Sequence, residues 1–219
     1  MLLLYAVLFG LVAGLLTRGS IAALGSVKIK LWPVALIGLA FQLLLFSSPL
    51  AAVVGRLGPS LYVISTALVL MALVVNVRQP GFWLIALGAF ANFVVIVTNG
   101  GQMPASPEAF TMLYGTPMVP TTNFSNSVIA GPNTQFYFLA DIFVLPRPIP
   151  LANVFSLGDV LIGLGGAWFI VRVMHRQPTN RSSPGRPPDN AAHKLLQRLR
   201  SGSAEPDGSG SRAGRRVAN

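Results

Sequence analysis

The feature that most constrains this chain is a series of five apolar segments, each close to the roughly 20 residues that a helix needs to cross about 30 Å of hydrocarbon. The segments are Leu2–Thr17, Leu31–Phe46, Leu61–Val77, Phe82–Thr98 and Val160–Met174. Only 10% of all residues are charged, compared with about 25% in a typical soluble domain. The sequence therefore predicts an all-α integral membrane protein with about five transmembrane helices.

The positively charged residues are distributed unevenly around these segments. Arg18, Lys28 and Lys30 follow the first segment, Arg78 follows the third, and ten of the 16 Lys and Arg residues lie from Arg172 onward. By the positive-inside rule these regions are cytoplasmic, so we expect the N-terminus outside and the C-terminus in the cytoplasm. A signal peptide would carry a basic residue before its apolar run, and none precedes the first segment. We therefore expect an uncleaved span.

The connection between the fourth and fifth segments, residues 99–155, is too long and too apolar for a free loop. It contains eight prolines and the apolar run Phe136–Phe143. Connections beyond about 12–15 residues are usually functional or disordered, and disorder requires low hydrophobicity. We therefore expect an ordered extracytoplasmic cap over residues 99–155, within a membrane domain of residues 1–177.

Residues 178–219 are rich in Pro, Gly, Ser and Arg, which predicts a disordered basic cytoplasmic tail. Near 190–201 a helix would place Leu195, Leu196 and Leu199 on one face, with basic residues around them. A short amphipathic helix of this kind suits the anionic lipid of the cytoplasmic leaflet; a solvated tail that never orders is the alternative. Because the charge lies in a tail and not in a groove, we expect no nucleic-acid partner.

The chain lacks the residues that several classes of chemistry require. The chain has no cysteine, which removes disulfides and thiol catalysis. Its two histidines, His175 and His193, lie in or beside the tail. The membrane body thus has no histidine for haem, zinc or general base catalysis, and we expect no cofactor, no metal centre and no catalytic residue.

Only three carboxylates precede the tail: Glu108, Asp141 and Asp159, all on the predicted outer side together with Arg147. Such a cluster could bind a hard cation through oxygen ligands or attract a cationic solute. The structural alternative pairs Asp141 or Asp159 with Arg147 and leaves Glu108 to help start a helix. The sequence leaves both interpretations open.

Asp159 also has a purely structural explanation. Ser156 precedes it by three residues, which is capping-box spacing with Asp in place of the preferred Glu or Gln. Ser156 would accept a hydrogen bond from the amide of Asp159, whose carboxylate would accept from the amide of Ser156. An acid in the first turn also gains roughly 0.3–1 kcal/mol from the helix dipole. The default interpretation of Asp159 is therefore a helix cap.

The other polar motifs predict local structure. Asn99-Gly100-Gly101 indicates a turn where the fourth segment ends, because Asn and Gly tolerate positive φ; Met103 and Pro104 follow directly. As a phosphate-binding loop this phrase is weak, since it has no lysine and follows a helix where a P-loop follows a strand. Within the segments we expect interhelical hydrogen bonds of about 0.6 kcal/mol each from three uncharged residues, Gln42, Asn76 and Asn92.

Three phrases together resemble a family of small bacterial multi-pass inner-membrane proteins catalogued as a domain of unknown function. They are NGGQMP at Asn99–Pro104, FLADIF at Phe138–Phe143 and ANVFSLGDVLI at Ala152–Ile162. The resemblance covers about residues 99–162 and implies a location in the plasma (inner) membrane of a bacterium. It brings no activity, so no catalytic role is transferred to any residue.

Our leading functional interpretation is a non-enzymatic binding or scaffold protein that acts through its cap on a membrane or cell-envelope partner, within the lipid bilayer. The alternative is a small transporter or channel component with an outer vestibule of Asp141, Asp159 and Glu108. No ionisable residue lies deep in a segment, where ion relays usually keep one, and this counts against transport. An intramembrane enzyme has the least support, because no segment contains a His, a Cys or a pair of acids.

Overall fold

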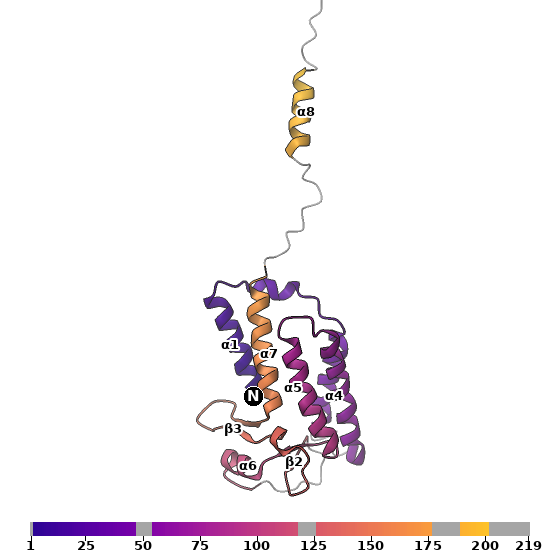
Figure 1. The fold of residues 1–219 in the computed structure, drawn as a ribbon, viewed down its shortest axis with the longest axis vertical. Coiled ribbons are helices and arrows are strands. Elements are labelled where there is room, and N and C mark those ends of the chain that lie inside the picture. Colours follow the sequence, from indigo (N-terminus) through magenta and orange to yellow (C-terminus); the bar gives the residue numbers. More distant parts are fainter. Residues whose placement is uncertain (1, 47–53, 118–125, 177–188, 202–219) are drawn as a thin grey trace, which may run out of the picture. The chain divides into compact units, whose positions relative to one another are not determined.

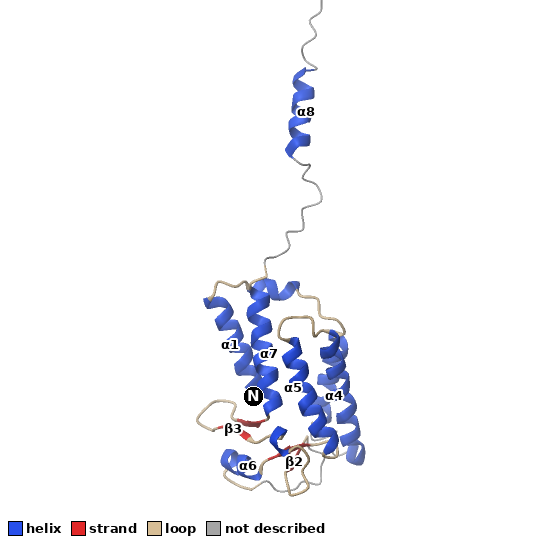
Figure 2. Cartoon of the chain, in the orientation of Figure 1, coloured by secondary structure: helices blue, strands red, loops and turns tan. Residues whose placement is uncertain are grey.

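The computed structural model of the chain describes residues 2–46, 54–117, 126–176 and 189–201. The chain divides into two units, Met1–Pro178 and Thr179–Asn219, and each is described here by itself. Helices dominate the described residues (Figure 2).

The first unit is built on five apolar helices that coincide with the five predicted segments. Their order in space is α1, α7, α5, α4, α2, because each of these contacts the next (Figure 1). The last helix in sequence, α7, therefore lies between α1 and α5. The bounds are α1 Leu2–Leu16, α2 Trp32–Leu45, α4 Gly58–Val75, α5 Phe82–Thr98 and α7 Leu157–Met174, with the short 3-10 helices η1 Ile21–Ser26 and η2 Gly55–Leu57.

Two helices begin earlier than the apolar segments alone predict. α4 begins at Gly58, and Pro59 lies in its first turn, where the missing N–H of proline has no helical partner to lose. α7 begins at Leu157 because Ser156 caps it.

The surface of the bundle is unusually apolar. α7 and the stretch Gly55–Val75 are long and apolar enough to cross a membrane, whereas α1, α2 and α5 are apolar but shorter. Large side chains on their outer faces are exposed, among them Phe9 at 68% and Leu43 at 77%. Exposed apolar area on this scale is unfavourable in water and suits a lipid environment.

The cap packs on one end of the bundle, shown at the bottom of Figure 1. Its strand β1 pairs in parallel with β2 and, through Ala105, with Asp141, while β3 pairs with β4 in antiparallel. The hydroxyl of Tyr5 in α1 donates to the carbonyl of Pro150, which ties the cap to the first helix. The elements are β1 Met103–Ala105, α6 Pro107–Tyr114, β2 Ser127–Ile129, η3 Tyr137–Leu139, β3 Phe143–Leu145 and β4 Asn153–Phe155.

These strands depart from the expected all-α fold (Figure 2). Each has three residues, and they occur in the proline-rich connection. Proline cannot donate a helical hydrogen bond and restricts the residue before it to extended conformations. The apolar residues of the cap therefore pair as short strands.

In the second unit the structure describes one helix, α8 Asp189–Ser201, over the segment predicted to be amphipathic. Its Leu195, Leu196 and Leu199 are exposed, and Arg198 and Arg200 lie in its last turn. The predicted disorder of the remaining tail falls on residues outside the described ranges.

Candidate functional site: a polar cavity beneath the cap

The two ends of the first unit differ in chemistry and are named here for that difference. The cap end carries residues 99–155 together with the adjoining ends of α2, α4, α5 and α7. The basic end consists of residues 17–31, 76–81 and 172–176.

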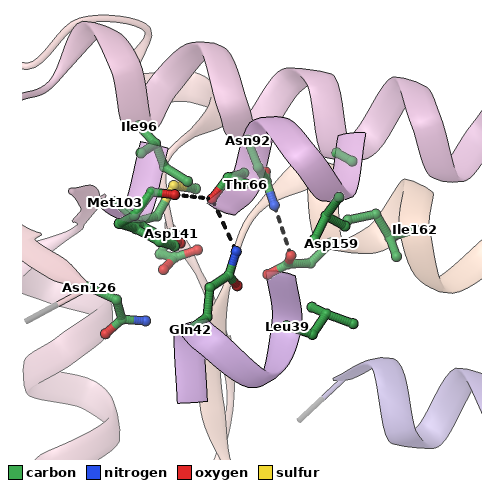
Figure 3. A pocket seen from close by; sticks show the side chains of 13 residues that line it. Leu39, Gln42, Thr66, Asn92, Ile96, Met103, Asn126, Asp141, Asp159 and Ile162 are labelled. Carbon is green, nitrogen blue, oxygen red and sulfur yellow. Dashed lines mark hydrogen bonds between the residues drawn. The ribbon is translucent and has the colours of Figure 1, made fainter. Parts of the chain in front are cut away.

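A cavity of about 250 Å³ lies at the cap end (Figure 3). Four helices and the cap contribute to its wall, and the residues come from positions far apart in the sequence. Its polar lining consists of Gln42, Tyr62, Thr66, Asn92, Asn126, Asp141 and Asp159, and its apolar lining of Leu39, Val69, Ala89, Ile96, Met103 and Ile162.

Asp159 lies on this cavity and caps α7 as well. The Ser156 Oγ accepts a hydrogen bond from the Asp159 amide at 3.1 Å, and Asp159 Oδ2 accepts from the Ser156 amide at 3.3 Å. The other carboxylate oxygen, Oδ1, accepts from Asn92 Nδ2 at 2.9 Å (Figure 3). The Ser156 Oγ in turn donates to Asn92 Oδ1 at 2.9 Å. Asp159 therefore combines the capping function with a position at the cavity.

Close packing of α5 on α7 fixes this arrangement. A Cβ atom added to Gly158 would overlap the Asn92 side chain, and one added to Gly88 would overlap the Gly158 carbonyl. The absence of side chains at both positions allows Asn92 to reach Ser156 and Asp159.

Asp141 is held by its backbone and leaves its carboxylate for the cavity. Its amide donates to the Pro104 carbonyl at 2.9 Å, and its carbonyl accepts from the Ser106 amide at 3.0 Å. No described residue donates a hydrogen bond to its carboxylate. Burial raises the pKa of Asp141 to about 7, and the negative charge of Asp159 adds to the increase.

The other two predicted site residues lie elsewhere. Arg147 does not line the cavity, and its guanidinium donates to the Tyr114 carbonyl at 2.6 Å. Glu108 is exposed in the first turn of α6, where Ser106 Oγ donates to its carboxylate at 2.6 Å and lowers its pKa. Of the four predicted residues, the structure brings only Asp141 and Asp159 to one cavity.

The Asn99-Gly100-Gly101 turn does not line the cavity but positions the strand that does. Asn99 Oδ1 accepts from the Gln135 amide at 2.9 Å, and its Nδ2 donates to the Gln135 carbonyl at 3.0 Å. Gly101 has φ +81° and lies so close to Pro59 that a Cβ atom would be 2.6 Å from the proline Cβ. The turn therefore directs the chain into β1, where Met103 lines the cavity and the Pro104 carbonyl holds Asp141.

Sequence reasoning missed most of the uncharged lining. The sequence predicts only helix packing for Gln42 and Asn92, and its patterns give no role to Tyr62, Thr66 or Asn126. Gln42 Nε2 donates to Thr66 Oγ1 at 3.2 Å, so this pair links α2 to α4 beside the acids (Figure 3). A signal was present, since in the predicted topology these helical polar residues all fall in the outer halves of their segments.

The cavity can attract a cation and also contact hydrocarbon. Two carboxylates line it, and among the residues that the structure describes neither an Arg nor a Lys does. Within the described residues there is no group of three or more His, Cys, Asp or Glu side chains that could hold a metal ion. The apolar lining would instead suit the carbon atoms of an organic cation.

Comparison with protein families places this cavity in context. Residues 26–171, more than half of the chain, match the family of unknown function DUF5317. This chain belongs to that family. No curated protein and no solved structure matches it. The predicted membership of an uncharacterised family is thus confirmed, and every cavity-lining residue lies within the region that matches DUF5317.

Proposed function

We propose that this protein is a multi-pass protein of the bacterial inner membrane that binds a small organic cation in the cavity beneath its cap. The observation that carries the proposal is that Asp141 and Asp159 line one cavity to which no basic side chain of the described residues contributes. Two carboxylates that share a site disfavour each other's ionisation. A bound cation would relieve that repulsion.

The remaining lining supports an organic ligand. The volume of about 250 Å³ lies just below the roughly 300–1,000 Å³ of typical small-molecule sites, which favours a compact ammonium compound. Gln42 donates to Thr66 through its Nε2, which leaves its Oε1 as an acceptor for an N–H or O–H donor of the ligand. Leu39 and Ile162 supply apolar contacts.

The distribution of residues supports the proposed membrane orientation. All three tryptophans lie in the half of the bundle toward the basic end: Trp32 and Trp83 at the starts of α2 and α5, and Trp168 in α7. The four tyrosines, Tyr5, Tyr62, Tyr114 and Tyr137, all lie toward the cap end. Aromatic belts of this kind mark both interfaces of a bilayer, and the positive charges of the basic end favour the cytoplasmic side.

Helix length is compatible with five spans. The helices have 14–18 residues, which correspond to about 21–27 Å at 1.5 Å per residue. This is shorter than a hydrocarbon core of about 30 Å, a mismatch that bilayers accommodate at modest cost by local thinning.

Binding can be tested with a cation and its uncharged isostere. Wild-type protein in dodecyl maltoside micelles, which contain no choline headgroup, is titrated with choline and with 3,3-dimethyl-1-butanol by calorimetry. We expect choline alone to bind and Asp141→Asn to weaken it by about tenfold or more, because a charge-assisted contact contributes roughly 1.5–3 kcal/mol.

Glu108→Gln is the matched control, since it removes an acid of the same end that lies outside the cavity. Equal binding of choline by wild type and Asp141→Asn, or equal binding of the two isosteres, would contradict a cation site. Flux of choline into vesicles would extend the function from binding to transport.

Recognition of a partner through the cap is a second candidate, favoured by the exposed apolar side chains of the cap. Met112 is 72% and Phe138 62% exposed. A photo-crosslinking amino acid at position 138 should capture a defined partner in the membrane, and one at the exposed Asn133 should not. Capture of lipid alone from position 138 would instead assign this surface to the bilayer.

A further inference from the structure

A second cavity, of about 460 Å³, lies at the basic end and has no part in the function proposed above. It is lined by Arg78, Pro80, Arg172, His175 and Arg176. The residues come from the turn between α4 and α5 and from the end of α7, so the cavity combines two separate segments of the chain.

His175 is held in a geometry that suits its charged form. Its Nδ1 lies 2.7 Å from the Val171 carbonyl oxygen, and its Nε2 lies 2.9 Å from the Thr17 carbonyl oxygen. A carbonyl oxygen only accepts hydrogen bonds, so the ring makes both of these hydrogen bonds only when both of its nitrogens carry hydrogen. These two contacts raise the pKa of His175 and so favour its positively charged form beside three arginines.

Hydrogen bonds tie the walls of this cavity together. The Arg176 guanidinium donates to Gln79 Oε1 at 3.1 Å, which joins the end of α7 to the turn between α4 and α5. The Ser20 amide donates to the Met174 carbonyl at 2.7 Å, which joins α7 to the chain that leaves α1. The cavity is therefore formed before any ligand binds.

No acid neutralises these cations within the first unit. Its three carboxylates, Glu108, Asp141 and Asp159, all lie at the cap end. The guanidinium groups of Arg78 and Arg172 make no hydrogen bond to another described residue. Like charges gathered without a counter-charge repel one another, and a bound anion would remove this cost.

The geometry points to a phosphate group as the ligand of this basic cavity. Arginine presents a planar fork of donors that matches the oxygens of phosphate, and three arginines converge here. The Trp83–Trp168 pair, with ring centroids 6.2 Å apart, lies in the same half of the bundle. The phosphate could belong to a lipid headgroup at the interface or to a soluble phosphate ester.

Two measurements on the full chain distinguish these sources. In the first, protein in phosphatidylcholine nanodiscs is titrated with inorganic phosphate by calorimetry. In the second, protein from nanodiscs of equimolar phosphatidylcholine and phosphatidylglycerol is examined by native mass spectrometry for retained phosphatidylglycerol. Binding in the first assigns a soluble phosphate, and selective retention in the second assigns a lipid.

The double variant Arg172→Gln with Arg176→Gln should weaken the observed binding by about tenfold or more, because two charge-assisted contacts are lost. Arg56→Gln, which removes an exposed arginine at the other end, should change it by less than about twofold. The basic tail is present in every variant, so its contribution cancels.

Helical circular dichroism and a single elution peak establish that each variant folds. If the double variant does not fold, Arg78→Gln replaces it, since Arg78 holds no described part of the structure together and should still weaken binding. The inference is overturned if neither measurement detects binding, or if the folded variants bind as wild type does.

Discussion

At each end of the first unit an asparagine links two separate segments of the chain, yet the two ends carry opposite charge. At each end an asparagine directly follows a helix and pairs through its side-chain O and N with the amide and carbonyl of one distant residue. Asn99, after α5, pairs with Gln135 at 2.9 and 3.0 Å. Asn76, after α4, pairs with Lys30 at 2.9 and 2.7 Å.

Comparison of the two ends indicates which side chains are available to bind a ligand. The asparagine links are uncharged, so neither link depends on an ion pair. The carboxylate of Asp141 and the guanidinium groups of Arg78 and Arg172 make no hydrogen bond to another described residue and line cavities of opposite sign. Asp159 and Arg176 line the same two cavities and also hold helices in place.

The largest expected effect comes from breaking the two asparagine links. Asn76 is only 4% exposed and also donates to the Ala72 carbonyl, so Asn76→Ala leaves several polar groups unpaired. A buried group without its partner costs about 1–3 kcal/mol, and we expect a loss of about 3 kcal/mol in unfolding free energy.

Asn99 is more exposed, and water can replace its contacts. Asn99→Ala should therefore cost only about 1 kcal/mol. Denaturation in detergent measures the unfolding free energy of both variants. Equal losses would show that the burial of each asparagine does not determine how much its link stabilises the protein.

Asp141→Asn tests whether the negative charge of Asp141 lowers the stability of the folded protein. The folded-state pKa of about 7 lies above the usual 3.8, so the folded protein holds this proton more tightly than the unfolded chain does. Stability should consequently fall as pH rises from about 4 to about 7. Above pH 7 Asp141→Asn should be more stable than wild type by on the order of 2 kcal/mol, after allowance for solvent screening.

Melting midpoints at pH 5 and pH 8 measure this effect, and the advantage of the variant should shrink at pH 5. Choline binding should weaken in wild type below pH 7, by about tenfold per unit for one competing proton. A variant that is less stable than wild type at pH 8 would mean that Asp141 serves the fold.

The positions of the helices could be predicted from sequence because long apolar runs without prolines in their interiors are typical of helices. The capping geometry of Ser156 and Asp159 could also be predicted, since it depends on residues three apart. The turn at Asn99 could be predicted as well, because it also depends on residues that are close in sequence.

The cavity could not be predicted, because it depends on non-local packing. Hydropathy does not specify that α7 lies between α1 and α5, nor how each helix is rotated. Strands of three residues are too short for periodicity to detect. The position of Asp141 follows from its pairing with Pro104 and Ser106, a contact across more than 30 residues that no local pattern encodes.

Asp159→Asn should act in the opposite direction to Asp141→Asn, which separates the two acids of one cavity. Asp159 accepts hydrogen bonds from Ser156 and Asn92 and lies at the positive end of α7. Loss of its charge should destabilise the protein by about 1 kcal/mol.

Ser156→Ala is the matched control for the cap, with an expected loss of similar size. Melting midpoints at pH 8 measure both changes. If Asp159→Asn were stabilising, the carboxylate would belong to the cavity alone and the capping interpretation would be wrong.

Arg147→Gln should have the smallest effect on stability and on choline affinity. It tests whether Arg147 acts as a counter-ion to the acids of the cap end. Arg147 is exposed and donates to the Tyr114 carbonyl, so its loss should cost about 0.5 kcal/mol. Removal of a distant positive charge should raise choline affinity by less than about twofold, and only at low salt, because ions screen such interactions. An increase of tenfold that persists at high salt would instead identify Arg147 as the partner of Asp141, and the cap end would then resemble a neutral structural pair more than a cation site.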